Sequence, residues 1–465
     1  MIVTSNRFLK SLLLVLFTSI LFISKSNAQS KADKIQELMK LYSEYYQFNG
    51  SVLVGENGKV VFKDGFGMAN MEWNIPNAPN TKHRLGSITK QFTAMLILQL
   101  VEAGKLDLEV PITTYLTDYP KENGEKITLH HLLTHTSGIP NYTSFPKFFE
   151  DKSRNPYTPS QFIQEFQDME LEFQPGEKFA YSNSGYFLLG AIIEKVTGKT
   201  YEENLKEKIF DPLNMKDSGF DHHEKILKNR ATGYDKRGDS YTNAPFLDMS
   251  IPYAAGSLYS TVEDLYLWDQ ALENNKLLSK KSTDLMFRGQ IKDGNGSYGY
   301  GWGVNKMLVD PKNDSLLVIG HGGGINGFNT LITRIPADQN LVVLLNNTGG
   351  TNLSEMSRNL IKILYDQPYE LPQRSLANYL MEKIYEKGLD AAMKDFEKLK
   401  ASKEYILREN ELNAVGYQFM GTGKLKEAIA VFKLNVDEFP ESFNVYDSLG
   451  EAYMNDGNKQ LAIEN

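Results

Sequence analysis

The chain has 465 residues, of which 41% are hydrophobic and 23% are charged, as is typical of a folded protein with two or three domains. Its formal net charge of −8, without a long run of like charge, argues against nucleic-acid binding, because such proteins present a basic surface to the phosphates. The sequence contains no cysteine, which excludes disulfides, thiolate metal sites and a cysteine nucleophile.

The first 28 residues predict a secretory signal peptide. Arg7 and Lys10 precede an apolar run at 12–23, and Ala28 follows in the small-residue pattern of a cleavage site. This run is short for a bilayer span, and a short membrane anchor is the alternative interpretation. We therefore expect an exported protein, periplasmic or extracellular, with no transmembrane segment in the mature chain.

Residues 50–67 predict a β-hairpin. Two runs rich in Val and Phe flank Asn57-Gly58, a dipeptide that suits the positive φ angles of a tight turn. The apolar stretch within 84–106 predicts a helix that is buried on most sides and ends at Gly104. Ser87 and Lys90 stand where this helix begins.

After residue 105 the sequence predicts first helices and loops and then strands. From residue 105 to about 310 the pattern is mostly that of helices and loops, and strands are expected at 314–324, 327–335 and 339–347. A helix over 353–365 should cover them. An early hairpin followed by late strands predicts one sheet whose strands come from both ends of the domain, in the α+β class.

Residues 366–374 contain two prolines and no periodicity, which predicts a linker. Beyond it, a pattern of apolar and small residues repeats with a period of 34, from 412–428 to 446–462. The pattern resembles tetratricopeptide repeats, which are paired helices. An irregular first pair is expected before it, and the sequence stops within the last repeat. Region 375–465 is therefore predicted to be helical, repeat-like and truncated.

Two roles stay open for the repeats. They extend the fold as a helical cap, or they present a concave surface to a protein partner. No feature of the sequence names a ligand for such a surface.

Ser87 and Lys90 suit nucleophilic catalysis. A serine hydroxyl needs a base within hydrogen-bond reach, and donors for the oxyanion that forms when it attacks a carbonyl group. At a helix start the N–H of Ser87 lacks an intrahelical partner, and Lys90 projects from the same face. The alternative is a helix cap beside a solvated lysine, because S-x-x-K alone occurs by chance in many proteins.

Two further segments favour catalysis. Tyr181 and Asn183 stand on a turn before an apolar helix, and the string His321-Gly322-Gly323-Gly324 ends a predicted strand. In this order, S-x-x-K, Y-x-N and H-x-G resemble the motifs of the penicillin-recognising serine hydrolases. That family includes class C beta-lactamases, D-alanyl-D-alanine carboxypeptidases, D-aminopeptidases and related esterases. Segments 132–140 and 254–268 also look like the family.

The resemblance implies a beta-lactamase/transpeptidase-like fold over residues 32–365. This fold is an antiparallel sheet flanked by helices plus an all-helical subdomain, here followed by the small all-α repeat region. The resemblance implies that Ser87 forms an acyl-enzyme with an ester, an amide or D-amino-acid peptide, or a beta-lactam, with no metal or cofactor. The residues implied as catalytic are Ser87, Lys90 and Tyr181, and those implied as substrate-binding are Asn183, His321, Gly323 and Gly324.

The base of the reaction stays open between two groups. Tyr181 is a candidate as a phenolate favoured by the charge of Lys90, but coupled groups titrate as a unit, so lysine is equally a candidate. The backbone N–H groups of Ser87 and of Gly324, on an edge strand, are the expected oxyanion donors. His321 stands where many relatives carry lysine, so a permanent cation for a substrate carboxylate is missing.

Three alternative hypotheses exist, and the sequence argues against each of them. The HGGG string of 321–324 occurs in alpha/beta-hydrolases, but the G-x-S-x-G that those enzymes need is absent. His131 and His135 have a zinc-ligand spacing, but Leu132 stands where a zinc protease needs glutamate. The third alternative is a catalytically silent scaffold whose repeats are functional, and the complete set of motif residues argues against it.

Overall fold

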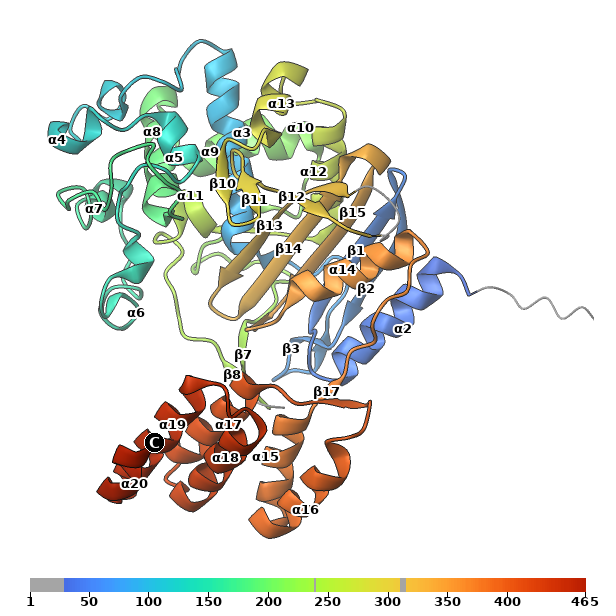
Figure 1. The fold of residues 1–465 in the computed structure, drawn as a ribbon. Helices are drawn as coiled ribbons and strands as arrows, with labels where there is room; N and C mark the ends of the chain where they lie inside the picture. Colours follow the sequence, from blue (N-terminus) through green and yellow to red (C-terminus); the bar gives the residue numbers. More distant parts are fainter. Residues whose placement is uncertain (1–28, 238–239, 310–314) are drawn as a thin grey trace, which may run out of the picture.

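The computed structural model describes residues 29–237, 240–309 and 315–465 (Figure 1). The predicted signal peptide lies outside these residues. None of the helices in the described part of the chain is both long and apolar enough to cross a bilayer.

An antiparallel eight-stranded sheet lies at the centre of the larger lobe (Figure 1), in the order β10-β11-β12-β13-β14-β15-β1-β2. Its strands are β1 (Gly50–Glu56), β2 (Lys59–Phe66), β10 (Ile291–Asp293), β11 (Gly296–Tyr298), β12 (Gly303–Met307), β13 (Leu316–Ile325), β14 (Phe328–Ile335) and β15 (Asn340–Asn346). β1 pairs with β15 from Gly50↔Asn346 to Gly55↔Leu341, so the two ends of the domain share one sheet, as predicted.

The hairpin turn between β1 and β2 has the predicted conformation. Asn57 and Gly58 have φ values of 51° and 73°, which these residue types adopt most readily. In contrast, the sequence did not predict β10, β11 and β12. These strands are only three to five residues long, so they are too short to show an alternating pattern.

The two faces of the sheet pack against different helices. On one face, Val52 and Val54 of β1 join a core with α2 and α14. On the other, Leu53 joins the larger core, which includes α3, α8 and α12. The alternation follows from the two-residue period of a strand. These helices are α2 (Lys31–Glu44), α14 (Leu353–Leu364), α3 (Thr89–Glu102), α8 (Asn183–Thr197) and α12 (Val262–Glu273).

Short helices and small sheets complete this lobe. In the view of Figure 1, most of these helices lie to the left of α3. The helices are α4 (Lys121–Gly124), α5 (Leu129–Leu133), α6 (Phe148–Asp151), α7 (Pro159–Ile163), α9 (Tyr201–Leu205), α10 (Asp211–Leu213), α11 (Tyr253–Gly256) and α13 (Lys280–Phe287). Single turns are η1 (Gly86–Ile88), η2 (Ile112–Thr114), η3 (Tyr142–Ser144), η4 (Lys206–Phe210) and η5 (Pro336–Asp338). The small sheets contain β3 (Met68–Asn70), β4 (Ile75–Pro76), β5 (His83–Arg84), β6 (Gly219–Phe220), β7 (Tyr234–Arg237), β8 (Ser240–Asn243), β9 (Leu258–Ser260) and β16 (Thr348–Gly349).

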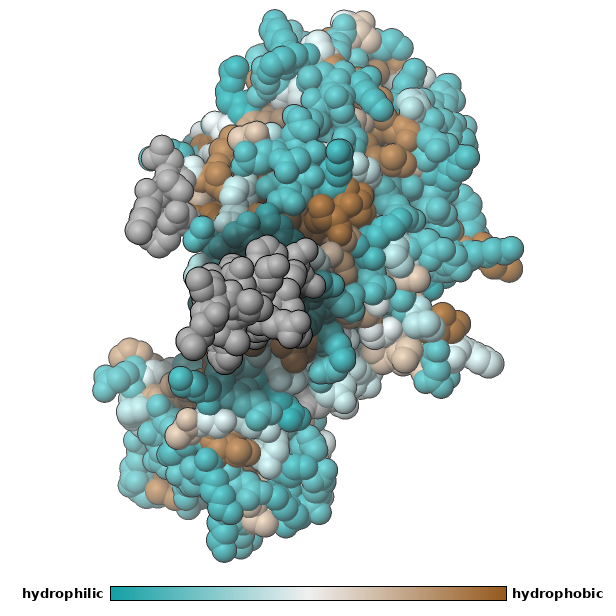
Figure 2. All heavy atoms as spheres, turned by 90° about the vertical axis from the view of Figure 1, so that its right-hand side faces the viewer, coloured by the Kyte–Doolittle hydropathy of each residue, from teal (hydrophilic) through white to brown (hydrophobic). Residues whose placement is uncertain are grey.

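The C-terminal helices form a separate lobe with its own hydrophobic core. They are α15 (Leu376–Lys387), α16 (Leu389–Leu399), α17 (Glu409–Gly421), α18 (Leu425–Glu438), α19 (Phe443–Asn455) and α20 (Lys459–Glu464). A Cβ at Gly416 of α17 would lie 2.4 Å from the Phe432 ring of α18, so glycine lets these two helices approach. Figure 2 shows this lobe set apart below a largely hydrophilic face with small, separate hydrophobic patches.

The segment predicted as a linker is held at its C-terminal end. Gln47 Nε2 donates a hydrogen bond of 2.7 Å to the carbonyl oxygen of Gln373. β17 (Arg374–Ser375) pairs in parallel with β18 (Tyr405–Ile406), and the Arg374 guanidinium lies 5.8 Å from the centroid of the Tyr45 ring. The domain boundaries themselves, and the assignment of these helices to tetratricopeptide repeats, stay predictions.

Candidate active site

Ser87 lies in η1, immediately before α3, with one side of the turn against β13. Gly86 has a φ of 54°, and a Cβ at this position would lie 2.9 Å from the backbone nitrogen of Gly324. Only glycine combines this conformation with so close an approach. The turn therefore brings Ser87 next to a strand that is more than 200 residues away in the sequence.

Lys90, in the first turn of α3, is fully buried. Its Nζ lies 3.1 Å from Ser87 Oγ, 2.8 Å from Asn183 Oδ1 and 2.9 Å from the carbonyl oxygen of Ala255. These three partners are uncharged. Burial away from water disfavours the ammonium form and holds the pKa of Lys90 well below its usual value.

The partners of Lys90 define which hydrogen bond its amine accepts. The carbonyl oxygens of Asn183 and Ala255 can only accept, so a neutral amine gives its two protons to them. Its lone pair is then left for the third neighbour, the hydroxyl of Ser87. In this state the serine donates its proton toward the lysine nitrogen.

Tyr181 and Asn183 flank the start of α8, where Ser182 is the N-cap and accepts from the Gly185 N–H. The Tyr181 ring centroid lies 4.8 Å from Lys90 Nζ. The Tyr181 hydroxyl is buried and makes no hydrogen bond within the described part of the chain. Burial raises the pKa of Tyr181 above its usual value, although the nearby Ser87 hydroxyl acts in the opposite direction. Tyr181 is therefore a neutral phenol at neutral pH.

His321 lies on β13 with its ring fixed at both nitrogens. Nε2 is 2.9 Å from Tyr298 Oη, and Nδ1 is 2.6 Å from the Gly322 carbonyl oxygen. Burial, together with the proximity of Lys90, lowers the pKa of His321 to about 4. At neutral pH this side chain is uncharged, so it does not supply a permanent cation for a substrate carboxylate.

His135 contributes to the site although the sequence did not predict it there. It is buried, has a φ of 56°, and its ring centroid lies 4.2 Å from that of Tyr181. Its Nδ1 accepts from the Ser182 N–H at 3.1 Å, so the ring proton is on Nε2. Helix α5 ends at Leu133, so His135 does not share a helix face with His131. The only sequence signal for His135 was that it lies in the segment 132–140, which resembles the family.

β13 is an interior strand in its first half and an edge in its second half, where Gly324 lies, so the prediction that Gly324 stands on a strand edge is confirmed. It pairs with β12 only up to Gly320, and beyond that residue it pairs only with β14. A Cβ at Gly323 would lie 1.9 Å from the Leu85 carbonyl oxygen, so Gly323 faces the η1 turn. A Cβ at Gly324 would have room, since its nearest neighbour would be Asn329 Nδ2 at 3.8 Å. The free edge beside Ser87 is therefore available to a substrate.

A cavity of about 130 Å³ opens beside Ser87. Asn183 and Gly324 line it, whereas Gly323, Tyr181 and His321 do not. The structure thus brings the predicted residues together around Ser87, but only some of them line the cavity.

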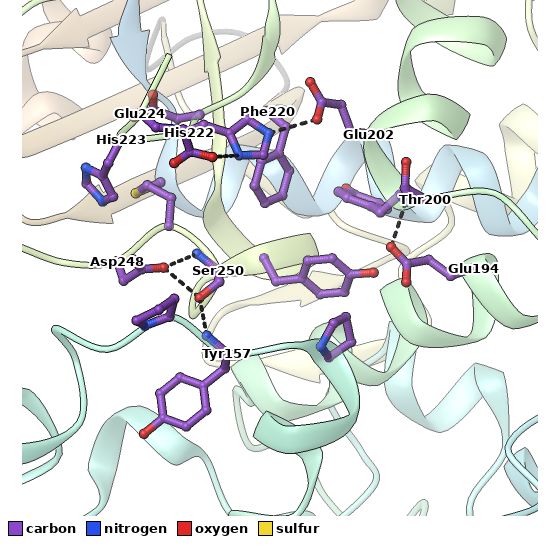
Figure 3. Close-up of a pocket in the computed structure, with 16 residues that line it drawn as sticks. Tyr157, Glu194, Thr200, Glu202, Phe220, His222, His223, Glu224, Asp248 and Ser250 are labelled. Atoms are coloured by element: carbon purple, nitrogen blue, oxygen red, sulfur yellow. Dashed lines mark hydrogen bonds and ion pairs between the residues drawn. The ribbon is translucent and has the colours of Figure 1, made fainter.

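A second cavity, of about 320 Å³, lies on the far side of the segment 247–256 (Figure 3). Its polar side chains already pair with one another. His222 Nε2 lies 2.8 Å from Glu202 Oε2, and the Ser250 hydroxyl donates to Asp248 at 2.6 Å. Ser250 has no lysine or histidine partner in this network, so Ser87 is the serine whose surroundings suit nucleophilic attack.

Comparison with known proteins agrees with this geometry. Residues 32–366 match the beta-lactamase family over more than two thirds of the chain. The chain belongs to the beta-lactamase family. A Bacillus subtilis (strain 168) family relative, described as a penicillin-binding protein, is 33% identical over 342 residues, which cover 73% of this chain and 81% of the relative.

Two further family relatives carry names of hydrolases. The teichoic acid D-alanine hydrolase of Staphylococcus aureus is 31% identical over 328 residues, covering 70% of this chain and 76% of that protein. The D-amino acid amidase of Ochrobactrum anthropi SV3 superposes with a TM-score of 0.62 at 25% identity, covering 73% of this chain and 98% of the amidase. The fold predicted for residues 32–365 is that of the family.

Proposed function

We propose that this protein is a serine hydrolase that forms an acyl-enzyme through Ser87 and acts on carboxylic esters, amides or D-amino-acid peptides, or beta-lactams. The observation that carries the proposal is the buried amine of Lys90, 3.1 Å from the Ser87 hydroxyl and surrounded by uncharged acceptors. Hydrolase names among the relatives support the reaction class.

In the first step, Ser87 Oγ attacks the carbonyl carbon and its proton passes to the neutral amine of Lys90. The negative charge develops on the carbonyl oxygen, where the backbone N–H groups of Ser87 and Gly324 act as donors. Lysine rather than tyrosine is the base in this proposal, because burial favours a neutral amine and disfavours a phenolate.

Collapse of the tetrahedral intermediate requires a proton for the leaving group. The phenol of Tyr181 supplies it and regains a proton from the Lys90 ammonium, which lies over its ring. Asn183 holds Lys90 through its side-chain oxygen. Water then attacks the acyl-enzyme by the same steps in reverse, which releases the acid and restores Ser87. His135 holds the backbone of Ser182, between Tyr181 and Asn183.

Export to the cell envelope belongs to this proposal. The relatives named as a penicillin-binding protein and as a teichoic acid D-alanine hydrolase support this compartment. The sequence pattern of residues 1–28 points to the same compartment.

The test uses covalent labelling and turnover together. A fluorescent phosphonate should label the protein on Ser87, and a panel of p-nitrophenyl acetate, nitrocefin and a D-Ala-D-Ala peptide should define the bond that is cleaved. The alternative is a silent binding scaffold whose repeats mediate protein interactions. Absence of both labelling and turnover in the folded protein would favour that alternative.

A further inference from the structure

The cavity beside Ser87 is lined without a single charged side chain among the residues the structure describes. Its polar side chains are those of serine, threonine, tyrosine and asparagine. The remaining lining consists of backbone, aromatic rings and aliphatic groups. The lining residues with large apolar side chains are Tyr142, Phe148, Phe149, Leu247, Ile251 and Ile325.

The cavity faces the acyl part of a substrate. Under the proposed function, Tyr181 delivers a proton to the leaving group, so the leaving group lies on the Tyr181 side of Ser87. Neither Tyr181 nor His321 lines the cavity, whereas Ser87 and Gly324 do. The group that stays attached to Ser87 in the acyl-enzyme is therefore the one that fills the cavity.

The size and walls of the cavity suit one compact apolar group. Its volume of about 130 Å³ is close to the roughly 150 Å³ of an apolar protein cavity that binds benzene. Tyr142, Phe148 and Leu247 are buried and fixed in the surrounding core, whereas Phe149, the second residue of α6, is 50% exposed at the mouth. An aromatic ring at the mouth can close over an apolar substituent.

Two polar side chains of the wall already have partners. The Tyr142 hydroxyl donates to the Ile251 carbonyl oxygen at 3.2 Å, and Asn326 Nδ2 donates to the Pro245 carbonyl oxygen at 2.9 Å. An ammonium or carboxylate that entered would lose its water without gaining a partner of opposite charge. The cavity therefore selects by polarity as well as by size.

We propose that Ser87 accepts acyl groups with an uncharged aromatic or short aliphatic substituent and discriminates against acyl groups that carry a free α-ammonium or a carboxylate. This proposal rests on the proposed function, because it concerns the same nucleophile. This acyl specificity would distinguish the chain from hydrolases that release free amino acids from their esters or amides.

The test compares two p-nitrophenyl esters that differ by one charge. The 3-phenylpropanoate is neutral, and the D-phenylalanine ester is the same acyl group with an α-ammonium. Each rate is divided by the rate of hydroxide-catalysed hydrolysis, since the ammonium activates the ester chemically. The normalised kcat/KM should favour the neutral ester at least tenfold.

Two variants test the wall. Phe149→Ala should lower kcat/KM for the phenylpropanoate relative to the acetate by about tenfold, since it removes the ring at the mouth. Phe246→Ala is the matched control, because Phe246 is 48% exposed and does not line the cavity. Asn326→Asp places a carboxylate in the cavity and should shift the ratio of the two esters toward the ammonium-bearing one.

Phosphonate labelling of Ser87 distinguishes failure of the acyl specificity from failure of the proposed function. If Ser87 is labelled and the ammonium ester is hydrolysed as well as the neutral one, the acyl specificity is refuted while the hydrolase function stands. The same holds if neither ester reacts with a protein that is labelled. If Ser87 is not labelled, the proposed function fails and the specificity fails with it.

Discussion

The Nζ of Lys90 lies 3.1 Å from the Oγ of Ser87, and the lysine side chain has no exposed surface. A buried amine without an opposing carboxylate is costly to protonate, so it is available as a base at neutral pH. This pair is the basis of the first three predictions below.

Ser87→Ala should abolish phosphonate labelling and ester hydrolysis and leave the fold intact. Ser87 is not the N-cap of a long helix, and losing a helix-start hydroxyl costs about 1 kcal/mol at most. Labelling and circular dichroism of the same sample check both parts. A labelled Ser87→Ala protein would assign the nucleophile to another serine.

Lys90→Met should reduce kcat by about 10²–10⁴-fold and raise the free energy of unfolding. The folded-state pKa of Lys90 is below the unfolded value, so the unfolded chain binds more protons between the two, and stability rises with pH across that window. The variant has no such group, so it should be more stable at neutral pH and lose this slope.

Denaturant titrations from pH 6 to pH 9 would measure that slope for the wild type and Lys90→Met. A variant that keeps the wild-type dependence of stability on pH would show that the pKa of Lys90 is not lowered by folding. Lys90→Arg is a useful companion, because arginine stays protonated and should be inactive at every pH.

Tyr181→Phe should lower kcat with substrates that have a basic leaving group more than with p-nitrophenyl esters. A phenolate leaving group needs little protonation, whereas an amine needs a full proton. The double variant with Lys90→Met should lose less than the product of the two single losses, because the residues act on one proton. Equal losses with both types of substrate would remove Tyr181 from the proton path.

Two adjacent glycines should respond differently to alanine. At Gly323 the added methyl group meets the Leu85 carbonyl oxygen at 1.9 Å, so Gly323→Ala should destabilise the fold by about 1–3 kcal/mol and displace the η1 turn that carries Ser87. At Gly324 the methyl group has room, so the unfolding free energy should stay within about 0.5 kcal/mol. Thermal unfolding of both variants checks the contrast, and equal stability would contradict the close approach.

A chain cut to residues 30–366 should fold and hydrolyse a small ester. The buried residues of the two main cores of the larger lobe end at Leu364, so the cut removes only the partly buried Tyr369 from their edge, and the helical lobe has a core of its own. The cut removes the hydrogen bond from Gln47 to Gln373, a contact near the surface. Insoluble or inactive protein would show that the C-terminal helices complete the catalytic domain.

The sequence predicted the elements that carry strong local patterns. The Asn57-Gly58 hairpin, the apolar helix after Ser87 and the last three strands of the sheet are present in the structure. β10, β11 and β12 were missed, because their short pairing depends on neighbours in space rather than on periodicity.

The motifs located the residues around Ser87, but not what surrounds them. The carbonyl group of Ala255 and the ring of His135 come from loops whose positions depend on tertiary packing. The cavity wall combines Tyr142, Leu247 and Ile325, which lie on three separate segments. Contacts between distant loops cannot be inferred from a single sequence. Neither the depressed pKa of Lys90 nor the uncharged lining of the cavity could therefore be predicted.

The pairing of β1 with β15 has a consequence for synthesis of the protein. β1 pairs at once with β2, but its other neighbour, β15, is synthesised nearly 300 residues later, because Gly50 lies opposite Asn346. β13, which flanks Ser87, gains its place in the complete sheet only through β14 and β15. Contacts so distant along the chain form slowly and late. A nascent chain that has not yet reached Asn346 is therefore inert, and hydrolysis reports that the eight-stranded sheet is complete.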